Sequence, residues 1–297
     1  MTPDISRTQA WILAARPKTL TAAAAPVLAG VGVAAHHDTF RPLPALAALL
    51  GAILIQIATN LANDYYDFVR GGDTAERVGP VRVTQAGIIP PATVKRGMIL
   101  TLMAALLVGV YLVFVGGWPI VWIGVLSLAL AVLYTGGPFP LAYHGLGDVF
   151  VFVFFGLVAV TGTFYVQGLA WPRDAFLAGA AMGGLTTAIL VVNNLRDIET
   201  DAKVGKRTLA VRLGRAGTRA EYVLMLALAL VAPLLGVAWM GWPVAVFVVY
   251  LVLPFCIRPV RTVLRFEHAG ELLPALGQTS RVVALYGLLL AMGLAFG

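Results

Sequence analysis

Long runs of apolar residues, separated by short polar segments, occupy almost the whole chain. About 20 apolar residues in a helix cross a hydrocarbon core of about 30 Å. Nine runs approach or exceed this length, far longer than the strands of a membrane β-barrel. The chain is therefore predicted to be an all-α, polytopic membrane bundle forming one domain over residues 1–297. The nine predicted transmembrane helices are residues 19–36, 43–63, 94–116, 118–135, 146–169, 174–195, 218–239, 242–258 and 273–296.

Composition supports the same class. Apolar residues make up 60% of the chain and charged residues only 12%, where soluble domains carry about 25% charged residues. The mean hydropathy is +0.88. These values exclude a soluble enzyme and a disordered chain, and the single cysteine, Cys256, excludes a disulfide scaffold.

The basic residues predict an orientation for the bundle. Of the 21 Lys and Arg, all except Arg41 and Arg173 fall before, between or after the spans on one side, which leaves 19 there. The positive-inside rule places that side, and the N-terminus, in the cytoplasm. The net charge of +7 is thus a topology signal, and nucleic acid is not an expected partner. Residues 1–17 lack the features of a signal peptide, and Trp11 to Leu13 predict a short interfacial helix instead.

Two acidic segments follow spans two and six. The first reads N-L-A-N-D-Y-Y-D-F-V-R-G-G-D at 60–73, and the second N-N-L-R-D-I-E-T-D at 193–201. In each, an Asn precedes an Asp by four residues, which puts both side chains on one stripe of a helix. The pairs are Asn63 with Asp67 and Asn193 with Asp197, and each pair is followed by a further acid, Asp73 or Asp201. An even number of spans separates them, so both emerge at the same face.

Clustered carboxylates at a membrane edge repel one another unless a cation compensates them. Asp and Asn oxygens suit Mg²⁺, which often bridges carboxylates to a substrate phosphate. Two facing clusters would hold Mg²⁺ around one diphosphate, and nearby cations would neutralise its remaining charge: Arg70, Arg77, Lys206 and Arg207. A single Asn-x-x-x-Asp is more simply a helix cap with solvated loop charges, but the repetition favours a shared site.

The chain resembles the UbiA superfamily of intramembrane aromatic prenyltransferases, and within it the MenA type that prenylates 1,4-dihydroxy-2-naphthoate. The resemblance covers nearly the whole chain. Small departures are Ala86, where Ser is more usual, and Y-T-G-G-P-F-P at 134–140. The matching strings are A-R-P-K-T-L at 15–20, N-D-Y-Y-D at 63–67, R-V-G-P-V-R-V-T-Q-A-G at 77–87, N-N-L-R-D-I-E-T-D at 193–201 and G-K-R-T-L-A-V-R-L-G at 205–214.

This resemblance implies Mg²⁺-dependent transfer of a polyprenyl group from its diphosphate to 1,4-dihydroxy-2-naphthoate, with loss of CO₂, giving demethylmenaquinone for menaquinone synthesis. The protein is expected in the lipid bilayer of the cell inner membrane, with its site open to the cytoplasm. The implied metal ligands and catalytic acids are Asp67, Asp73, Asp197 and Asp201, with Asn63 and Asn193 as ligands or ligand-positioners. Asp64 joins the metal set with a less defined role, because it is turned about 100° from this stripe.

Several further residues are candidates for the pocket. Tyr65, Tyr66 and Tyr134 are expected to line a chamber that shields an allyl cation, although interfacial anchoring explains a tyrosine equally simply. Lys18 would pair with the naphthoate carboxylate or pyrophosphate, or act only as a positive-inside anchor. Arg82 and Gln85 would cap the pocket or only fix their loop.

Other readings stay open. Sister enzymes of the superfamily use 4-hydroxybenzoate, homogentisate, haem or chlorophyllide as acceptor, and acceptor choice rests on few residues. A CDP-alcohol phosphotransferase also has paired Asp motifs, but its D-G-x-x-A-R…G-x-x-x-D-x-x-x-D string is absent. A cation-coupled transporter usually carries its acids at broken helices in mid-membrane, whereas these lie at span ends. Asp148, at the start of span five, is a functional candidate or a first-turn acid favoured by the helix dipole.

Overall fold

The computed structural model describes residues 5–71, 78–79 and 81–297, and this part of the chain is helical, without a strand. The α-helices are α1 (Arg7–Ala15), α2 (Pro17–His36), α3 (Pro42–Val69), α4 (Pro91–Gly116), α5 (Trp118–Leu133), α6 (Gly147–Val151), α7 (Ala159–Gly168), α8 (Arg173–Arg196), α9 (Ile198–Lys203), α10 (Leu209–Trp239), α11 (Leu253–Arg265) and α12 (Leu272–Ala295). The other helical segments are η1 (Leu141–His144), η2 (Phe152–Val158), η3 (Val244–Val252) and η4 (Ala269–Glu271).

The predicted all-α membrane bundle is confirmed, but its count of nine spans is not. Each predicted span is helical, and eight helices of the described chain are long and apolar enough to cross a membrane. The ninth, α5, has only 16 residues, about 24 Å of helix. Gly117, with a φ of 68°, precedes it, and Gly136 and Gly137 follow soon after it.

Two helices differ locally from the predicted spans. α3 continues past residue 63 to Val69, so the first acidic segment is helical up to Asp67. The predicted fifth span is one helix from Gly147 to Gly168 that contains a π-helical stretch, η2. There the backbone comes very close to α8, because a methyl group on Gly156 would overlap the backbone of Gly183.

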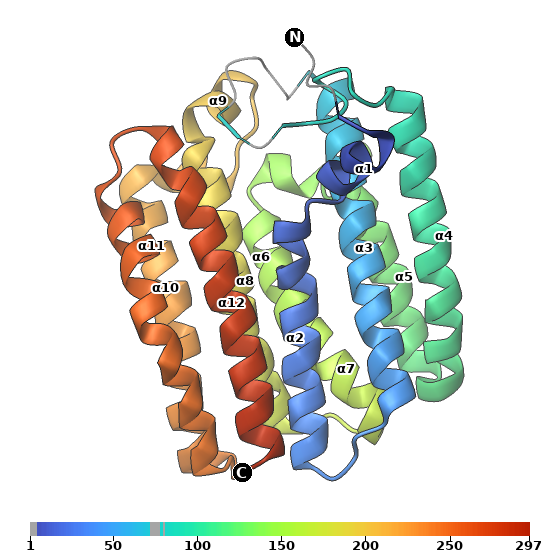
Figure 1. The fold of residues 1–297 in the computed structure, drawn as a ribbon, viewed down its shortest axis with the longest axis vertical. Helices are drawn as coiled ribbons and strands as arrows, with labels where there is room; N and C mark the ends of the chain where they lie inside the picture. Colours follow the sequence, from blue (N-terminus) through green and yellow to red (C-terminus); the bar gives the residue numbers. More distant parts are fainter. Residues whose placement is uncertain (1–4, 72–77, 80) are drawn as a thin grey trace.

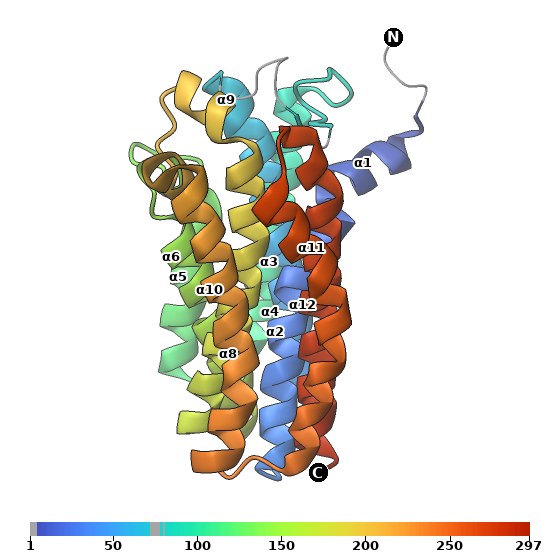
Figure 2. The same cartoon turned by 90° about the vertical axis from the view of Figure 1, so that its left-hand side faces the viewer.

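α8 is the central helix of the bundle. It packs against α10, η2, α12 and α2, and most of its residues are buried. In Figure 1, α10 to α12 lie on one side of α2, and α3 to α5 lie on the other. A view turned by 90° shows the helices running nearly parallel along the length of the molecule (Figure 2).

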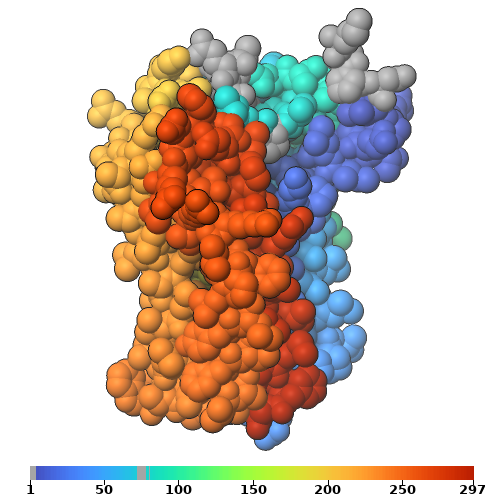
Figure 3. Space-filling model, turned by 60° about the vertical axis from the view of Figure 1, so that its left-hand side comes forward, coloured from blue at the N-terminus to red at the C-terminus, as the bar shows by residue number. Residues whose placement is uncertain are grey.

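The outer surface is apolar, as a bilayer requires. On α4, Leu100, Leu107 and Phe114 repeat every seven residues and are 70%, 69% and 84% exposed, so one face of α4 points outward. Figure 3 shows the side of the molecule that α10, α11 and α12 form. The protein is a multi-pass membrane protein.

The polar segments collect at one end, which we call the charged end. It carries α1, residues 81–90 of the loop between α3 and α4, and α9, at the top of Figure 1. Arg41 and Arg173 lie at the opposite end, where they begin α3 and α8. The short helix predicted around Trp11 is confirmed as α1, with a capping box formed by Ser6 and Gln9.

Candidate active site

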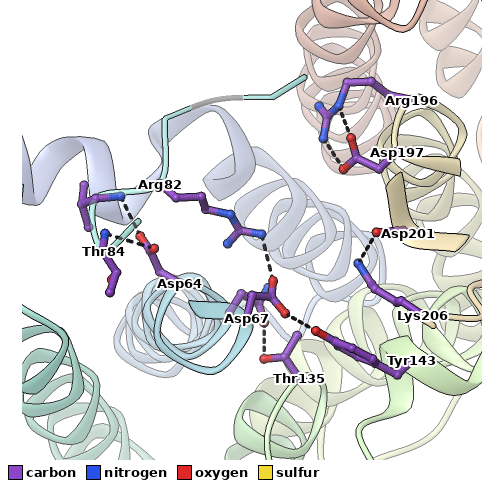
Figure 4. Close-up of polar contacts among 12 residues, drawn as sticks. Asp64, Asp67, Arg82, Thr84, Thr135, Tyr143, Arg196, Asp197, Asp201 and Lys206 are labelled. Atoms are coloured by element: carbon purple, nitrogen blue, oxygen red, sulfur yellow. Dashed lines mark hydrogen bonds and ion pairs between the residues drawn. The ribbon is translucent and has the colours of Figure 1, made fainter. Parts of the chain in front are cut away.

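The first acidic segment projects Asp67 from α3 into the charged end. Its Oδ2 accepts a hydrogen bond from Nη2 of Arg82 at 3.0 Å, and its Oδ1 accepts one from the Tyr143 hydroxyl at 3.1 Å. Asp67 and Arg82 are both buried. Four residues earlier, Asn63 accepts a hydrogen bond from the Thr135 hydroxyl at 2.9 Å. Asp67 is therefore held by two distant segments of the chain (Figure 4).

Asp64 points to a different place. Its carboxylate accepts the backbone N–H groups of Val83 at 3.2 Å and Thr84 at 3.4 Å, and it is 1% exposed. Asp64 thus fixes the loop that carries Arg82. It does not line the pocket that Asn63 and Asp67 face.

The second acidic segment spans the junction of α8 and α9. Arg196 binds Asp197 with two hydrogen bonds, Nε to Oδ1 at 2.8 Å and Nη2 to Oδ2 at 2.7 Å. One turn later, Asp201 Oδ1 accepts a hydrogen bond from Lys206 Nζ at 3.2 Å. Asp201 Oδ2 is buried, with no hydrogen-bond partner among the described residues.

Tyr143 links the two segments. Its hydroxyl binds Asp67, and its ring lies under the Lys206 ammonium, 5.7 Å from Nζ to the ring centroid. Lys206 in turn binds Asp201. A continuous series of polar contacts therefore joins Arg82 and Asp67 on one side to Lys206 and Asp201 on the other (Figure 4).

Both segments open into one polar pocket of about 100 Å³. Four oxygen-bearing side chains of the repeated motif line it, together with a buried acid from α6 and four cationic side chains. The motif residues are Asn63, Asp67, Asn193 and Asp197, the α6 acid is Asp148, and the cations are Arg16, Arg82, Arg196 and Lys206.

A larger apolar cavity of about 500 Å³ adjoins the polar pocket. Arg16, Asn63, Tyr134, Leu190 and Asn193 line both spaces. From there the apolar cavity extends between α2, α3, α4, α5, η2, α7 and α8 toward the opposite end. The polar pocket at the charged end is therefore continuous with an apolar cavity between the membrane helices.

Burial and the neighbouring acids change the ionisation of groups at the charged end. The pKa of Asp201 is raised by burial, which outweighs the nearby Lys206, while Asp197 and Asp67 add to the rise. The pKa of Tyr143 is raised by burial and by Asp67. These acids therefore lie close enough to act on common neighbours.

The donor set fits a hard divalent cation. Over the residues that the structure describes, no three of His, Cys, Asp and Glu form a ready-made metal cluster. Instead, carboxylate and amide oxygens from both halves line one pocket, and one oxygen each of Asp148 and Asp201 has no hydrogen-bond partner in the described chain. Mg²⁺ usually takes one or two carboxylates and completes its coordination with water and substrate phosphate.

The other predicted site residues divide into two groups. Arg82, Tyr134 and Lys206 line the polar pocket. Lys18, Gln85 and Arg207 are exposed and line neither cavity. Arg70 is also exposed, and its guanidinium binds the Gly137 carbonyl. Asp73 and Arg77 lie outside the described residues.

Tyr65 and Tyr66, which were expected to line the chamber, line neither the polar pocket nor the apolar cavity. Both lie on a different face of α3 from Asn63 and Asp67. Their rings pack edge to face, 5.0 Å between centroids, against an apolar cluster shared with α1. Consecutive residues on a helix are turned by about 100°, so these two tyrosines do not share the Asn63–Asp67 stripe.

Arg16 and Arg196, which line the polar pocket, and Tyr143, which contacts Asp67 beside it, were not predicted, and Asp148 was left with two readings. Arg16 lines both cavities and sits in the A-R-P-K-T-L string, two residues before the predicted Lys18. Arg196 stands next to Asp197 within the second motif, so its position alone is a signal. Tyr143 offers none. Asp148 is an acid at the start of an apolar span, and its buried, unpartnered oxygen favours the functional reading over the helix-dipole one.

The fold and this site define a membrane-embedded helical protein with paired acidic segments at the mouth of an apolar cavity. The UbiA prenyltransferase family matches residues 23–271, and the chain belongs to that family. A relative from Escherichia coli (strain K12), named 1,4-dihydroxy-2-naphthoate octaprenyltransferase, is 39% identical over 98% of this chain and 96% of its own length. A protein of the same name from Mycobacterium tuberculosis is 40% identical over 97% of each chain.

Solved structures share the fold at low identity. The apo structure of a UbiA homologue from Aeropyrum pernix K1 has a TM-score of 0.70 at 16% identity, covering 91% of this chain and 95% of its own. A UbiA homologue from Archaeoglobus fulgidus, solved bound to DMAPP and Mg²⁺, has a TM-score of 0.65 at 15% identity, covering 95% and 98%. Because the chain belongs to this family, it is a prenyltransferase.

Proposed function

We propose that the protein transfers a polyprenyl group from an allylic diphosphate to 1,4-dihydroxy-2-naphthoate, releasing CO₂ and pyrophosphate. The observation that carries this proposal is that Asp67 and Asp197, 130 residues apart, line one polar pocket that adjoins an apolar cavity. A diphosphate with a long apolar tail needs both environments side by side. The names of the relatives that match nearly the full chain support the acceptor.

Mg²⁺ is the proposed cofactor. Asp67 and Asp197 would hold it from the two sides of the pocket, with Asn63 and Asn193 as further oxygen ligands. Asp201 lies one turn beyond Asp197 and has a spare carboxylate oxygen, and Asp73 is proposed as the corresponding residue of the first segment. When bound, the ion withdraws negative charge from the leaving pyrophosphate, as a Lewis acid does.

The cationic side chains of the pocket would bind the diphosphate. Arg16, at the start of α2, and Lys206, just after α9, both line the pocket. Fixed cations stabilise the charge that develops on the leaving group. As the carbon–oxygen bond breaks, its electron pair leaves with pyrophosphate. The allyl cation that remains lies at the junction with the apolar cavity, where water is excluded.

The acceptor would occupy the floor of the polar pocket near Tyr134 and Asp148. Asp148 is 4% exposed and its Oδ2 has no hydrogen-bond partner in the described chain, so it would accept a hydrogen bond from a naphthoate hydroxyl. The ring carbon that bears the carboxylate forms the new bond to the prenyl carbon. The carboxylate leaves as CO₂, and its bonding electrons restore the aromatic ring.

The charged end is proposed to face the cytoplasm, in the cell inner membrane. In the topology predicted from the sequence, all Lys and Arg except Arg41 and Arg173 fall on one side of the membrane. The positive-inside rule assigns that side to the cytoplasm. A cysteine introduced at exposed Gln85 should then react with a membrane-impermeant thiol reagent only in inverted vesicles.

The proposal is tested with purified protein in lipid vesicles, a prenyl diphosphate, Mg²⁺ and one acceptor at a time. Wild type should release pyrophosphate and CO₂ in equal amounts with 1,4-dihydroxy-2-naphthoate, and EDTA should stop both. Preference for 4-hydroxybenzoate or homogentisate would overturn the acceptor, and cation-driven uptake without product would overturn the reaction.

A further inference from the structure

Four arginines of α11 and α12 lie on the outer surface of the bundle. Arg258, Arg261 and Arg265 follow one another at intervals of three and four residues on α11, so they form one stripe of that helix. Arg281 belongs to α12, which packs against α11. All four are exposed, and none of them lines the polar pocket or the apolar cavity. Figure 3 shows this side of the molecule, coloured orange to red.

The surface around these arginines is apolar. Ile257 and Leu264, which stand next to arginines of the α11 stripe, are exposed. On α12, Leu288 is also exposed. It follows Arg281 by seven residues, about two turns, and therefore shares its face of the helix. The arginines thus belong to the part of the bundle that contacts the bilayer.

Two of the arginines lie some way down their helices. Arg258 is seven residues before Arg265, where α11 ends, about 10 Å along the helix. Arg281 is nine residues after Leu272, where α12 begins, about 14 Å. From Arg281 to Ala295, at the other end of α12, the helix spans about 21 Å, less than the hydrocarbon thickness of about 30 Å. Both guanidinium groups therefore lie near the boundary between lipid tails and headgroups, where an arginine extends its charge toward the headgroups.

The positive charge of this face is not neutralised by the part of the chain that the structure describes. None of the four guanidinium groups forms an ion pair or a hydrogen bond with a described residue. The turn between α11 and α12 carries two acids, Glu267 and Glu271. Glu271 already accepts the backbone N–H groups of Glu267 and His268. The face therefore keeps a net positive charge, and an anion from outside the chain would complement it.

We propose that these four arginines form a binding site for an anionic phospholipid of the surrounding leaflet. The guanidinium groups bind the lipid phosphate through charge-assisted hydrogen bonds, and Ile257, Leu264 and Leu288 contact its acyl chains. Clusters of basic residues at one membrane face attract anionic headgroups. A lipid fits better than an acidic protein, because the arginines lie at the headgroup level and among apolar side chains. The inference needs only the membrane location of the bundle and does not depend on the proposed reaction.

The test reconstitutes the protein into nanodiscs with equal amounts of phosphatidylglycerol and phosphatidylcholine, and native mass spectrometry identifies the lipids that stay bound after release into detergent. Wild type should retain phosphatidylglycerol in excess, and the double variant Arg258→Gln/Arg281→Gln should lower that excess about tenfold. The matched control is Arg7→Gln/Arg96→Gln. It removes the same charge from exposed arginines of α1 and α4, and it should keep the excess of wild type.

Thermal unfolding in a neutral detergent gives a second measurement, because a ligand that binds the folded state raises the melting temperature. Added phosphatidylglycerol should raise it for wild type and the control but not for the double variant, and inorganic phosphate should not replace the lipid. If the double variant does not elute as a single species, Arg261→Gln and Arg265→Gln are measured singly and should each lose part of the excess. The proposal is overturned by an unchanged lipid excess in the arginine variants, by an equal loss in the control, by an equal effect of inorganic phosphate, or by an acidic protein bound in place of lipid.

Discussion

Arg82 and Asp67 form a buried ion pair between a loop and a membrane helix, with 3.0 Å between Nη2 and Oδ2. Both side chains are less than 10% exposed. The loop that supplies Arg82 is itself held by Asp64, whose carboxylate accepts two backbone N–H groups from Val83 and Thr84. Two acids of one motif therefore have different partners: Asp64 binds the backbone of the loop, and Asp67 pairs with Arg82 from the same loop.

Arg82→Gln should destabilise the protein and reduce prenyl transfer together. Removing one partner of a buried ion pair leaves an uncompensated charge and typically costs about 3–5 kcal/mol, which should appear as a lower melting temperature in detergent. Arg215→Gln is the control, because Arg215 and Glu199 form an ion pair whose side chains are 45% and 74% exposed. Such surface pairs contribute about 1 kcal/mol or less. Equal melting temperatures for the two variants would contradict the role given to Arg82.

Asp67→Asn should change kcat and the Mg²⁺ dependence, whereas Asp64→Asn should change the melting temperature. Asp67 and Asp197 line the polar pocket, so Asp67→Asn should lower kcat at least a hundredfold and raise the Mg²⁺ concentration needed for half-maximal rate. Asp64 faces the loop instead, so Asp64→Asn should lower the melting temperature and leave the Mg²⁺ dependence close to that of wild type. The measurement is a Mg²⁺ titration of pyrophosphate release. An unchanged Mg²⁺ requirement in Asp67→Asn would remove Asp67 from the proposed metal site.

Hydropathy predicted most of this architecture because a bilayer leaves a helix few alternatives. Every predicted span is helical, and the bounds of α2 and α12 agree with prediction within two residues. The count of nine spans is not confirmed at α5, an apolar helix of 16 residues that begins after Gly117. Within the π-helical stretch η2, Gly156 lies very close to Gly183 on α8, and a hydropathy pattern does not contain contacts between distant helices.

The same limit applied to the site. Four-residue spacing placed Asn63 with Asp67 and Asn193 with Asp197, and all four line one pocket. The partners of these acids come from segments far away in sequence, as with Tyr143 and Asp67. Local spacing in the sequence therefore does not predict them. Tyr65 and Tyr66 line neither the polar pocket nor the apolar cavity, because their positions on α3 differ from the stripe of Asn63 and Asp67.

Asp148→Asn should weaken binding of the acceptor and leave the prenyl diphosphate unaffected. Asp148 is buried in the polar pocket, and one of its oxygens has no hydrogen-bond partner among the described residues. The amide keeps the size of the side chain and one acceptor oxygen, but it lacks the charge that strengthens a hydrogen bond from a naphthoate hydroxyl. We expect KM for the naphthoate to rise about tenfold, equivalent to about 1.4 kcal/mol. A rise in KM for the diphosphate alone would assign Asp148 to the other substrate.

Gly156→Ala should destabilise the bundle, whereas Gly124→Ala should not, although both glycines belong to membrane helices. A methyl group on Gly156 would overlap the backbone of Gly183, and a backbone cannot rotate away as a flexible side chain does. Overpacking of this kind typically costs about 1–3 kcal/mol. A methyl group on Gly124 enters open cavity space, where we expect a change within about 0.5 kcal/mol. Thermal unfolding of the two variants in one detergent compares them directly. Equal destabilisation would mean that the α6–η2–α7 helix can shift away from α8, and that its close approach is not what determines the shape of the cavity.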